Sequence, residues 1–237
     1  ATPIPRTLAM TLYGDLDVSV IDEMPAGRKP IVTKHFYEKD RLKVFGFMQK
    51  QIAEGRQVYV VYPLIQESEA LDLLDLQAGY EAIERSFPPP AYSIGVVHGK
   101  MKAEEKDFIM DHFKKNEIQI LLSTTVIEVG IDVPNATVMV IENAERFGLS
   151  QLHQLRGRVG RGGNQSYCIL MSKYELSNEG RKRLGAMVET NDGFEIANFD
   201  LQLRGPGDIQ GTRQSGMLDF KIADLSKDEK LVAYTRN

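Results

Sequence analysis

Residues 154–162, QLRGRVGRG, combine three arginines with three glycines. The nearest acidic residues are Glu145 on one side and Glu175 on the other, so this positive charge has no local counter-charge. Arginine suits phosphate because its planar fork matches two oxygens and stays charged. Glycine lets the main chain approach a ligand closely. The stretch therefore predicts a phosphate-binding turn, with a solvated basic turn as the alternative.

Composition limits the classes of protein that fit this turn. The 237 residues suffice for one large α/β domain, or for a domain with appended pieces. A formal charge of −4 argues against a protein that coats nucleic acid non-specifically, but it allows a local basic site. Cys168, the one cysteine, lies in the apolar run SYCILM and is expected to be a buried thiol in a reducing compartment. With no membrane-length apolar run and no signal-peptide pattern, we expect a cytoplasmic protein.

From residue 31 onward, apolar runs alternate with amphipathic stretches. Such alternation predicts βαβ units, and hence an α/β fold with a mostly parallel β-sheet flanked by helices. In the expected helix 102–116, the spacing places Phe108, Ile109, His112 and Phe113 on one face. Strands are expected at 32–37, 58–65, 92–99, 118–125, 136–142 and 166–172, and helices at 40–55, 68–87 and 149–156.

The two ends of the chain differ from this pattern, which suggests three parts. Residues 1–30 end in a Pro- and Gly-containing linker, and residues 31–174 hold the alternating pattern. In 175–237 the pattern stops: 177–190 reads as a helix, 193–205 is ambiguous between helix and strand, and 205–216 reads as a loop.

No stretch of the chain fits a nucleotide-binding loop of its own. GVVHGKM, 95–101, has the wrong spacing for a P-loop and a methionine after the lysine. GPGDIQG, 205–211, has one residue too many for a dinucleotide fingerprint and lacks a βα context. We therefore expect that this chain does not bind a nucleoside triphosphate by itself in the usual way.

Three motifs together resemble the second motor lobe of superfamily-2 helicases. The last motif of that family, Q-x-x-G-R-x-x-R, corresponds here to Gln154, Gly157, Arg158 and Arg161. LLSTTVIEVGIDVPNA, 121–136, resembles the preceding family motif, and ATPIPRTLA at the start resembles the motif that closes the first lobe. The resemblance implies a RecA-like lobe, with residues 1–30 as the end of the first lobe and a linker.

The segment 183–216 resembles the translocation motif shared by RecG-type branched-DNA translocases and Mfd-type transcription-repair coupling factors. The sequence GPGDIQGTRQSG, 205–216, is closer to the RecG type. This resemblance implies a helical hairpin followed by a loop, and an enzyme that remodels stalled forks and Holliday junctions in recombination and repair. An Mfd-type translocase and a non-enzymatic nucleic-acid-binding domain remain the alternatives.

The resemblance also implies a role for individual residues. Arg158 and Arg161 would sense the γ-phosphate of ATP, and no residue here is expected to bind a metal, because the P-loop and the Mg²⁺-binding acids belong to the first lobe. The expected partners are branched or duplex DNA, together with the first lobe and a wedge domain of the same chain. The chain alone is expected to be inactive as an ATPase. The other expected positions are Gly130, Asp132, Gln154 and Gly157 at the nucleotide, His98, Gly99, Thr124 and Thr125 at the DNA backbone, and Arg183 and Gln214 in translocation coupling.

Overall fold

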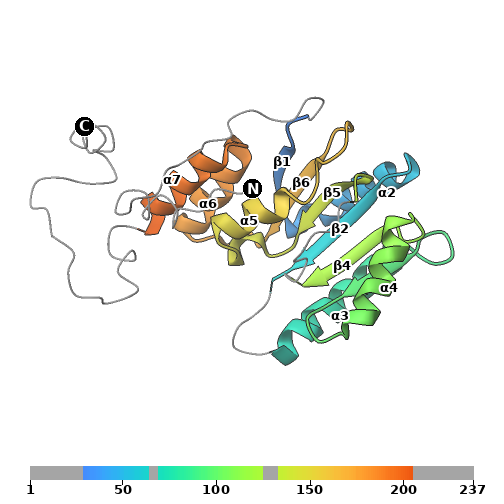
Figure 1. The fold of residues 1–237 in the computed structure, drawn as a ribbon. Helices are drawn as coiled ribbons and strands as arrows, with labels where there is room; N and C mark the ends of the chain where they lie inside the picture. The colour runs from blue at the N-terminus through green and yellow to red at the C-terminus, as the bar shows by residue number, and fades with distance from the viewer. Residues whose placement is uncertain (1–28, 64–68, 125–132, 205–237) are drawn as a thin grey trace, which may run out of the picture.

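The computed structural model describes residues 29–63, 69–124 and 133–204 (Figure 1). Six strands in this part form one sheet in the order β1-β6-β5-β2-β4-β3, and every neighbouring pair is parallel. The predicted class, a parallel sheet flanked by helices, is confirmed. The strands are β1 Val32–Tyr37, β2 Gln57–Tyr62, β3 Ile94–Val97, β4 Ile120–Thr124, β5 Ala136–Ile141 and β6 Tyr167–Ser172.

Helices cover both faces of this sheet. Those on one face are α2 Arg41–Ala53 and α3 Glu69–Ser86, and those on the other face are α4 Ala103–Lys114, α5 Leu149–Arg156, α6 Asn178–Glu189 and α7 Gly193–Arg204. Two short 3-10 helices, η1 Glu38–Asp40 and η2 Ala144–Arg146, follow β1 and β5. Gly55 has a φ of 80° just beyond α2, a left-handed conformation that suits glycine at a helix end.

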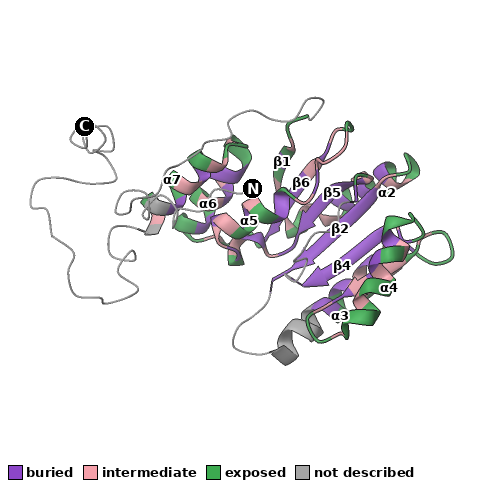
Figure 2. Ribbon diagram, in the orientation of Figure 1, coloured by how far each residue is buried: buried purple, intermediate pink, exposed green. Residues whose placement is uncertain are grey.

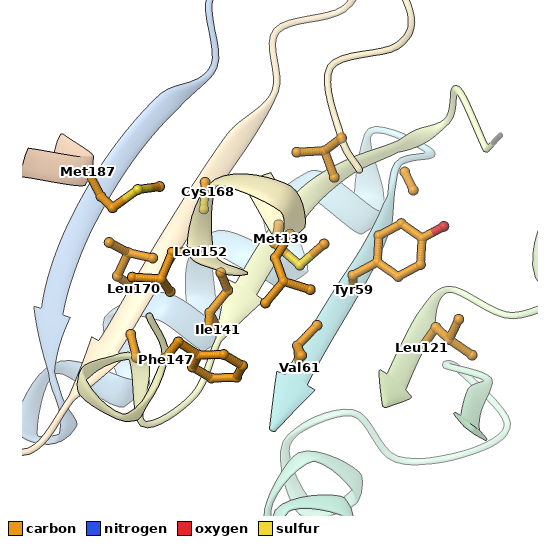
Figure 3. Packing of buried hydrophobic residues seen from close by; sticks show 14 of the residues in the cluster. Tyr59, Val61, Leu121, Met139, Ile141, Phe147, Leu152, Cys168, Leu170 and Met187 are labelled. Atoms are coloured by element: carbon orange, nitrogen blue, oxygen red, sulfur yellow. The ribbon is translucent and has the colours of Figure 1, made fainter. Parts of the chain in front are cut away.

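Alternate residues of each strand pack into two separate cores, because successive side chains point to opposite faces of a sheet. Along β2, for example, Val60 faces the α2 and α3 side, while Tyr59 and Val61 face the α4 and α5 side. The central strands β2, β4 and β5 are buried, whereas most of the edge strand β1 is exposed or half-buried and the outer helix faces are largely exposed (Figure 2). Cys168 lies in the core on the α4 and α5 side, together with Leu170 and Met187 (Figure 3). The prediction of a buried thiol is confirmed. Burial raises the pKa of that thiol to about 12.

Helix α4 buries only part of the face that its sequence predicts: Ile109 and Phe113 pack on the core, but Phe108 does not. Met110 and Phe113 face the core, whereas Phe108 is 64% exposed. Phe108 and Phe113 are five residues apart, which turns them about 140° away from each other around the helix. The exposed Phe108 ring lies 4.1 Å from the ring of His112 instead. The prediction of one shared apolar face was therefore wrong for Phe108.

In the ambiguous segment 193–205, residues 193–204 form a helix, α7, and with α6 it makes the predicted helical hairpin. Ser177 begins α6 by accepting a hydrogen bond from the Gly180 amide at 3.0 Å. Leu184 and Met187 of α6 and Ile196 of α7 enter the same core as Leu152 of α5. The hairpin therefore packs directly on the sheet domain. The predicted loop 205–216 lies outside the described residues.

Candidate functional site

The arginine-containing turn lies at the amino-terminal edge of the sheet. Since α5 follows β5 and precedes the parallel strand β6, its last residue returns the chain to this edge. A Cβ added to Gly160 would lie 2.9 Å from the Ile31 side chain, and one added to Gly162 would lie 3.2 Å from the Pro134 carbonyl oxygen. Ile31 comes directly before β1, and Pro134 comes two residues before the start of β5. The turn is thus fitted closely against the residues that begin two strands.

Arg156 is not part of the exposed charge that the sequence suggested. It is 2% exposed, and its guanidinium donates to the carbonyl oxygens of Met187 and Thr190 at 2.9 and 2.8 Å. It also donates to Thr33 Oγ1 at 3.3 Å and bonds His153 Nδ1 at 3.0 Å. Burial lowers the pKa of Arg156. Arg156 is therefore an internal anchor, which leaves two arginines of the turn for a ligand.

His153 takes part in this anchor as a neutral ring. Burial, followed by the nearby charge of Arg156, lowers the pKa of His153 to about 4. At neutral pH its Nδ1 is therefore an acceptor for the Arg156 guanidinium, and the proton resides on Nε2. Neutral His153 adds no second charge to the buried site.

The two remaining arginines of the turn, Arg158 and Arg161, are both partly exposed. Within the described parts of the chain, the Arg158 guanidinium has neither a hydrogen bond nor an ion pair. Gln154 and Gly157, at the end of α5, are exposed beside them, and the Gly157 amide continues the helix by donating to the His153 carbonyl at 3.0 Å. The structure thus brings Gln154, Gly157, Arg158 and Arg161 together. A half-exposed guanidinium on a glycine-rich turn fits the phosphates of a nucleotide.

Three of the four expected DNA-contacting residues, His98, Gly99 and Thr124, lie at the opposite, carboxyl-terminal edge. His98 follows β3 and Thr124 ends β4, and the register pairs the preceding residues Val97 and Ser123. Buried polar atoms of His98 (Nδ1) and Thr124 (Oγ1) have no hydrogen-bond partner among the described residues. Gly99 is exposed next to His98. Strands of five or six residues separate these groups from the arginine turn by about 16–20 Å.

A partly buried ion pair, not anticipated from the sequence, lies at the same carboxyl-terminal edge. Glu142 follows β5, is 3% exposed, and accepts two hydrogen bonds from Arg41 at 2.5 and 2.9 Å. Burial works to lower the pKa of Arg41, but the hydrogen bonds and charge of Glu142 raise it above its usual value. This pair fixes the start of α2 to the edge of the sheet.

Arg183 lies on α6 and contacts the segment before α5. Its guanidinium donates to the Phe147 carbonyl oxygen at 2.8 Å and pairs with Glu179 at 3.0 Å. The hairpin is therefore joined to the sheet domain at both ends of α5, through Arg183 and Arg156. Arg183 is part of that joint, and its coupling role stays a prediction.

Some predicted positions lie outside the described residues: Thr125, Gly130, Asp132 and Gln214. None of the described helices is long and apolar enough to cross a membrane. The described residues also hold no group of three or more His, Cys, Asp or Glu side chains placed to bind a metal ion.

The fold and the arginine turn define a helicase motor lobe. Residues 40–163 match the helicase conserved C-terminal domain, which is more than half of the chain. The chain belongs to this family. Residues 190–237 match a second family, described as ATP-dependent DNA helicase RecG, domain 3, C-terminal. That match falls on the hairpin and tail, where the sequence resembles the translocation motif.

Comparison with individual proteins points to RecG. The chain is 53% identical over its whole length to the ATP-dependent DNA helicase RecG of Synechocystis sp., and 53% identical to that of Bacillus subtilis. It spans 28% and 34% of these two relatives, about a third of their length. The predicted resemblance to RecG-type helicases is confirmed, and the Mfd-type alternative is not favoured.

Solved structures agree with this assignment. A structure of RecG bound to a three-way DNA junction matches 98% of the chain at 47% identity and a TM-score of 0.74, and the chain covers 30% of it. The S. cerevisiae protein Dbp5, bound to Gle1 and IP6, matches 84% of the chain and is half covered by it, at 15% identity and a TM-score of 0.52. This second likeness shows the fold alone.

Proposed function

We propose that this chain is the second motor lobe of an ATP-dependent DNA helicase that remodels branched DNA, such as stalled forks and Holliday junctions, in recombination and repair. The observation that carries the proposal is the arginine turn, in which a buried Arg156 holds the partly exposed Arg158 at one edge of the sheet. The similarity to RecG over the whole chain supports the choice of DNA substrate. Such an enzyme works in the cytoplasm.

At the nucleotide, Arg158 and Arg161 hold the γ-phosphate, and Gln154 and Gly157 border the same turn. Bound ATP with Mg²⁺ supplies the phosphoryl group and the metal charge, while the first lobe supplies the P-loop and the acidic metal ligands. An arginine placed on the transferring group contributes about 10³–10⁵ in rate. It does so only when the two lobes close, which links hydrolysis to lobe movement.

At the opposite edge, His98, Gly99 and the hydroxyl groups of Thr124 and Thr125 hold the DNA backbone. Hydroxyl and amide groups suit phosphate oxygens without reading bases, so this contact is independent of sequence. Among the described residues, His98 Nδ1 and Thr124 Oγ1 have no hydrogen-bond partner, and this supports the assignment because a buried polar group without a partner is costly.

Between the two edges, the hairpin transmits movement. Arg183 joins α6 to Phe147, and Gln214 follows in the tail. We assign both residues to the coupling of lobe closure with movement along DNA. The first lobe and the wedge domain of the same chain are the remaining partners in this scheme, and the domain limits at residues 30 and 174 belong to the same proposal.

The test compares full-length protein with its Arg158→Lys variant. DNA-stimulated ATP hydrolysis and unwinding of a synthetic fork should both fall by at least about two orders of magnitude in Arg158→Lys, since lysine lacks the bidentate fork. The 237-residue chain alone should hydrolyse no ATP, with or without DNA. Hydrolysis that copurifies with this chain and survives loss of Arg158 would refute the two-lobe assignment. DNA binding without any ATP-dependent activity in the full-length protein would favour the non-enzymatic alternative.

A further inference from the structure

Arg56 connects two loops that are distant in sequence. It lies at the amino-terminal edge of the sheet, between Gly55 and the start of the central strand β2. Its Nη1 donates to Asn135 Oδ1 at 3.3 Å, and its Nη2 donates to Asn164 Oδ1 at 2.9 Å. Asn135 comes directly before β5, and Asn164 follows the arginine turn. These three side chains form the Asn135–Arg56–Asn164 bridge.

The orientation of the Asn135 amide is set by its other contacts. Its Nδ2 donates to the Gly55 carbonyl oxygen at 2.8 Å, with a longer contact of 3.3 Å to Gln57 Oε1. The amide oxygen therefore faces Arg56. Gln57 is itself buried, and its amide donates to the Phe113 and Ile118 carbonyl oxygens at 2.5 and 2.7 Å. The bridge is thus attached to the rigid interior of the domain.

The two loops joined by the bridge also touch each other. A Cβ on Gly162 would meet the Pro134 carbonyl oxygen at 3.2 Å. The arginine turn is held at its beginning by buried Arg156 and at its end by the bond from Arg56 to Asn164. Between these two fixed points lie Arg158 and Arg161. Arg56 is therefore placed to influence the position of both side chains through Asn164.

We propose that Arg56 is a positioning residue for ATP hydrolysis, which acts by holding the arginine turn against the loop before β5. This inference rests on the proposed function. Its guanidinium suits the task because the planar fork reaches two acceptors at once, which a lysine ammonium on a single flexible stem does not. Misplacing a catalytic group by about 1 Å costs up to about 100-fold in rate. Loss of one of two fixed points is expected to cost about tenfold.

A double-mutant cycle in the full-length protein tests the bridge. The variants are Arg56→Gln, Asn164→Ala and the combination, and the measurements are kcat and KM for DNA-stimulated ATP hydrolysis. Each single variant should lower kcat about tenfold while KM for ATP changes less than about threefold. The combination should be no worse than the worse single variant, because both remove the same bond. Asn164→Asp keeps an acceptor oxygen and should retain kcat within about threefold.

The control is Arg85→Gln, which removes an exposed arginine on α3 whose Nε donates to the Glu81 carbonyl oxygen within the same helix. It should leave kcat unchanged. Additive losses in the cycle, or unchanged kcat in Asn164→Ala, would overturn the positioning role. Arg158→Ala in the same assay separates the two proposals. If it abolishes hydrolysis while the cycle is additive, only the bridge fails; if it retains hydrolysis, the proposed function itself fails.

Discussion

Arg156, the last residue of α5, donates a hydrogen bond to the carbonyl oxygen of Thr190 at 2.8 Å, 34 residues further along the chain. This bond joins the helix that leads into the arginine turn to the residue that follows α6. Charge-assisted hydrogen bonds are short and strong, so the pair makes a stiff connection. In the proposed mechanism, this bond would pass a movement of the turn on nucleotide binding to the hairpin.

The Arg156 anchor predicts a large loss of stability in Arg156→Met. Methionine fills a similar space but leaves the Met187 and Thr190 carbonyl oxygens buried without donors, which should lower the free energy of unfolding by at least about 2 kcal/mol. Urea denaturation followed by circular dichroism measures this. The matched variant Arg158→Met should stay within about 0.5 kcal/mol of wild type. Equal losses in both variants would show that Arg156 is no anchor.

The neutral His153 predicts a loss of stability in acid. Its pKa is about 4 in the folded chain, against an ordinary value of 6.5, so the unfolded chain binds more protons between these values. The contribution of His153 is therefore fully present above pH 6.5 and is lost as the pH falls toward 4. His153→Gln should flatten the stability profile in this window. A profile that keeps its slope in His153→Gln would contradict the assignment.

We expect that only glycine is tolerated at position 160. Its φ is 79°, and an added Cβ would lie 2.9 Å from the Ile31 side chain, so Gly160→Ala should cost about 1–3 kcal/mol. Gly163 provides a control in the same loop, because nothing lies within 4 Å of an added Cβ. Thermal unfolding should show a clear fall for Gly160→Ala and almost none for Gly163→Ala. The reverse order would mean that the turn has a different conformation.

The strands could be predicted because continuous apolar runs such as VYVVY need burial on both faces, which only a covered parallel sheet provides. The type of the segment 193–204 could not, since its pattern fits both periods and packing of Ile196 against the core decides for a helix. The resemblance marked Arg158 and Arg161, but nothing marked Arg156 as internal. Its main partners are carbonyl oxygens 31 and 34 residues away. Every residue has a main-chain carbonyl, so the sequence does not show which of them accept a hydrogen bond from Arg156.

Arg56 escaped prediction for a similar reason. Its partners Asn135 and Asn164 are 79 and 108 residues distant, and three strands must pair in the right order before the three side chains meet. The exposure of Phe108 shows a second limit of prediction from sequence. Spacing places residues on a helix face, but only the sheet beneath determines which face is buried.

Removing the contact between Arg183 and Phe147 should uncouple ATP hydrolysis from movement along DNA. In the full-length protein, Arg183→Ala should retain ATP hydrolysis within about twofold while fork unwinding falls at least about tenfold, because the bond to Phe147 is lost and the nucleotide site is untouched. Gln214→Arg should behave in the same way. Arg181→Ala, on the exposed side of the same helix, should change neither activity. Equal loss of both activities in Arg183→Ala would assign this residue to folding instead.

In the proposed scheme the amino-terminal edge of the sheet binds the nucleotide and the carboxyl-terminal edge binds DNA, and one experiment on full-length protein separates these two roles. DNA affinity is titrated against salt, and kcat for ATP is measured, for wild type, Arg158→Ala and Thr124→Val. Arg158→Ala should lower kcat by at least about 100-fold and leave DNA affinity within about threefold, with an unchanged salt slope. Thr124→Val should weaken DNA binding, and the rate of ATP hydrolysis in the absence of DNA should stay unchanged. A salt slope flattened by about one unit in Arg158→Ala, with normal kcat, would contradict the account, because the arginine would then bind DNA.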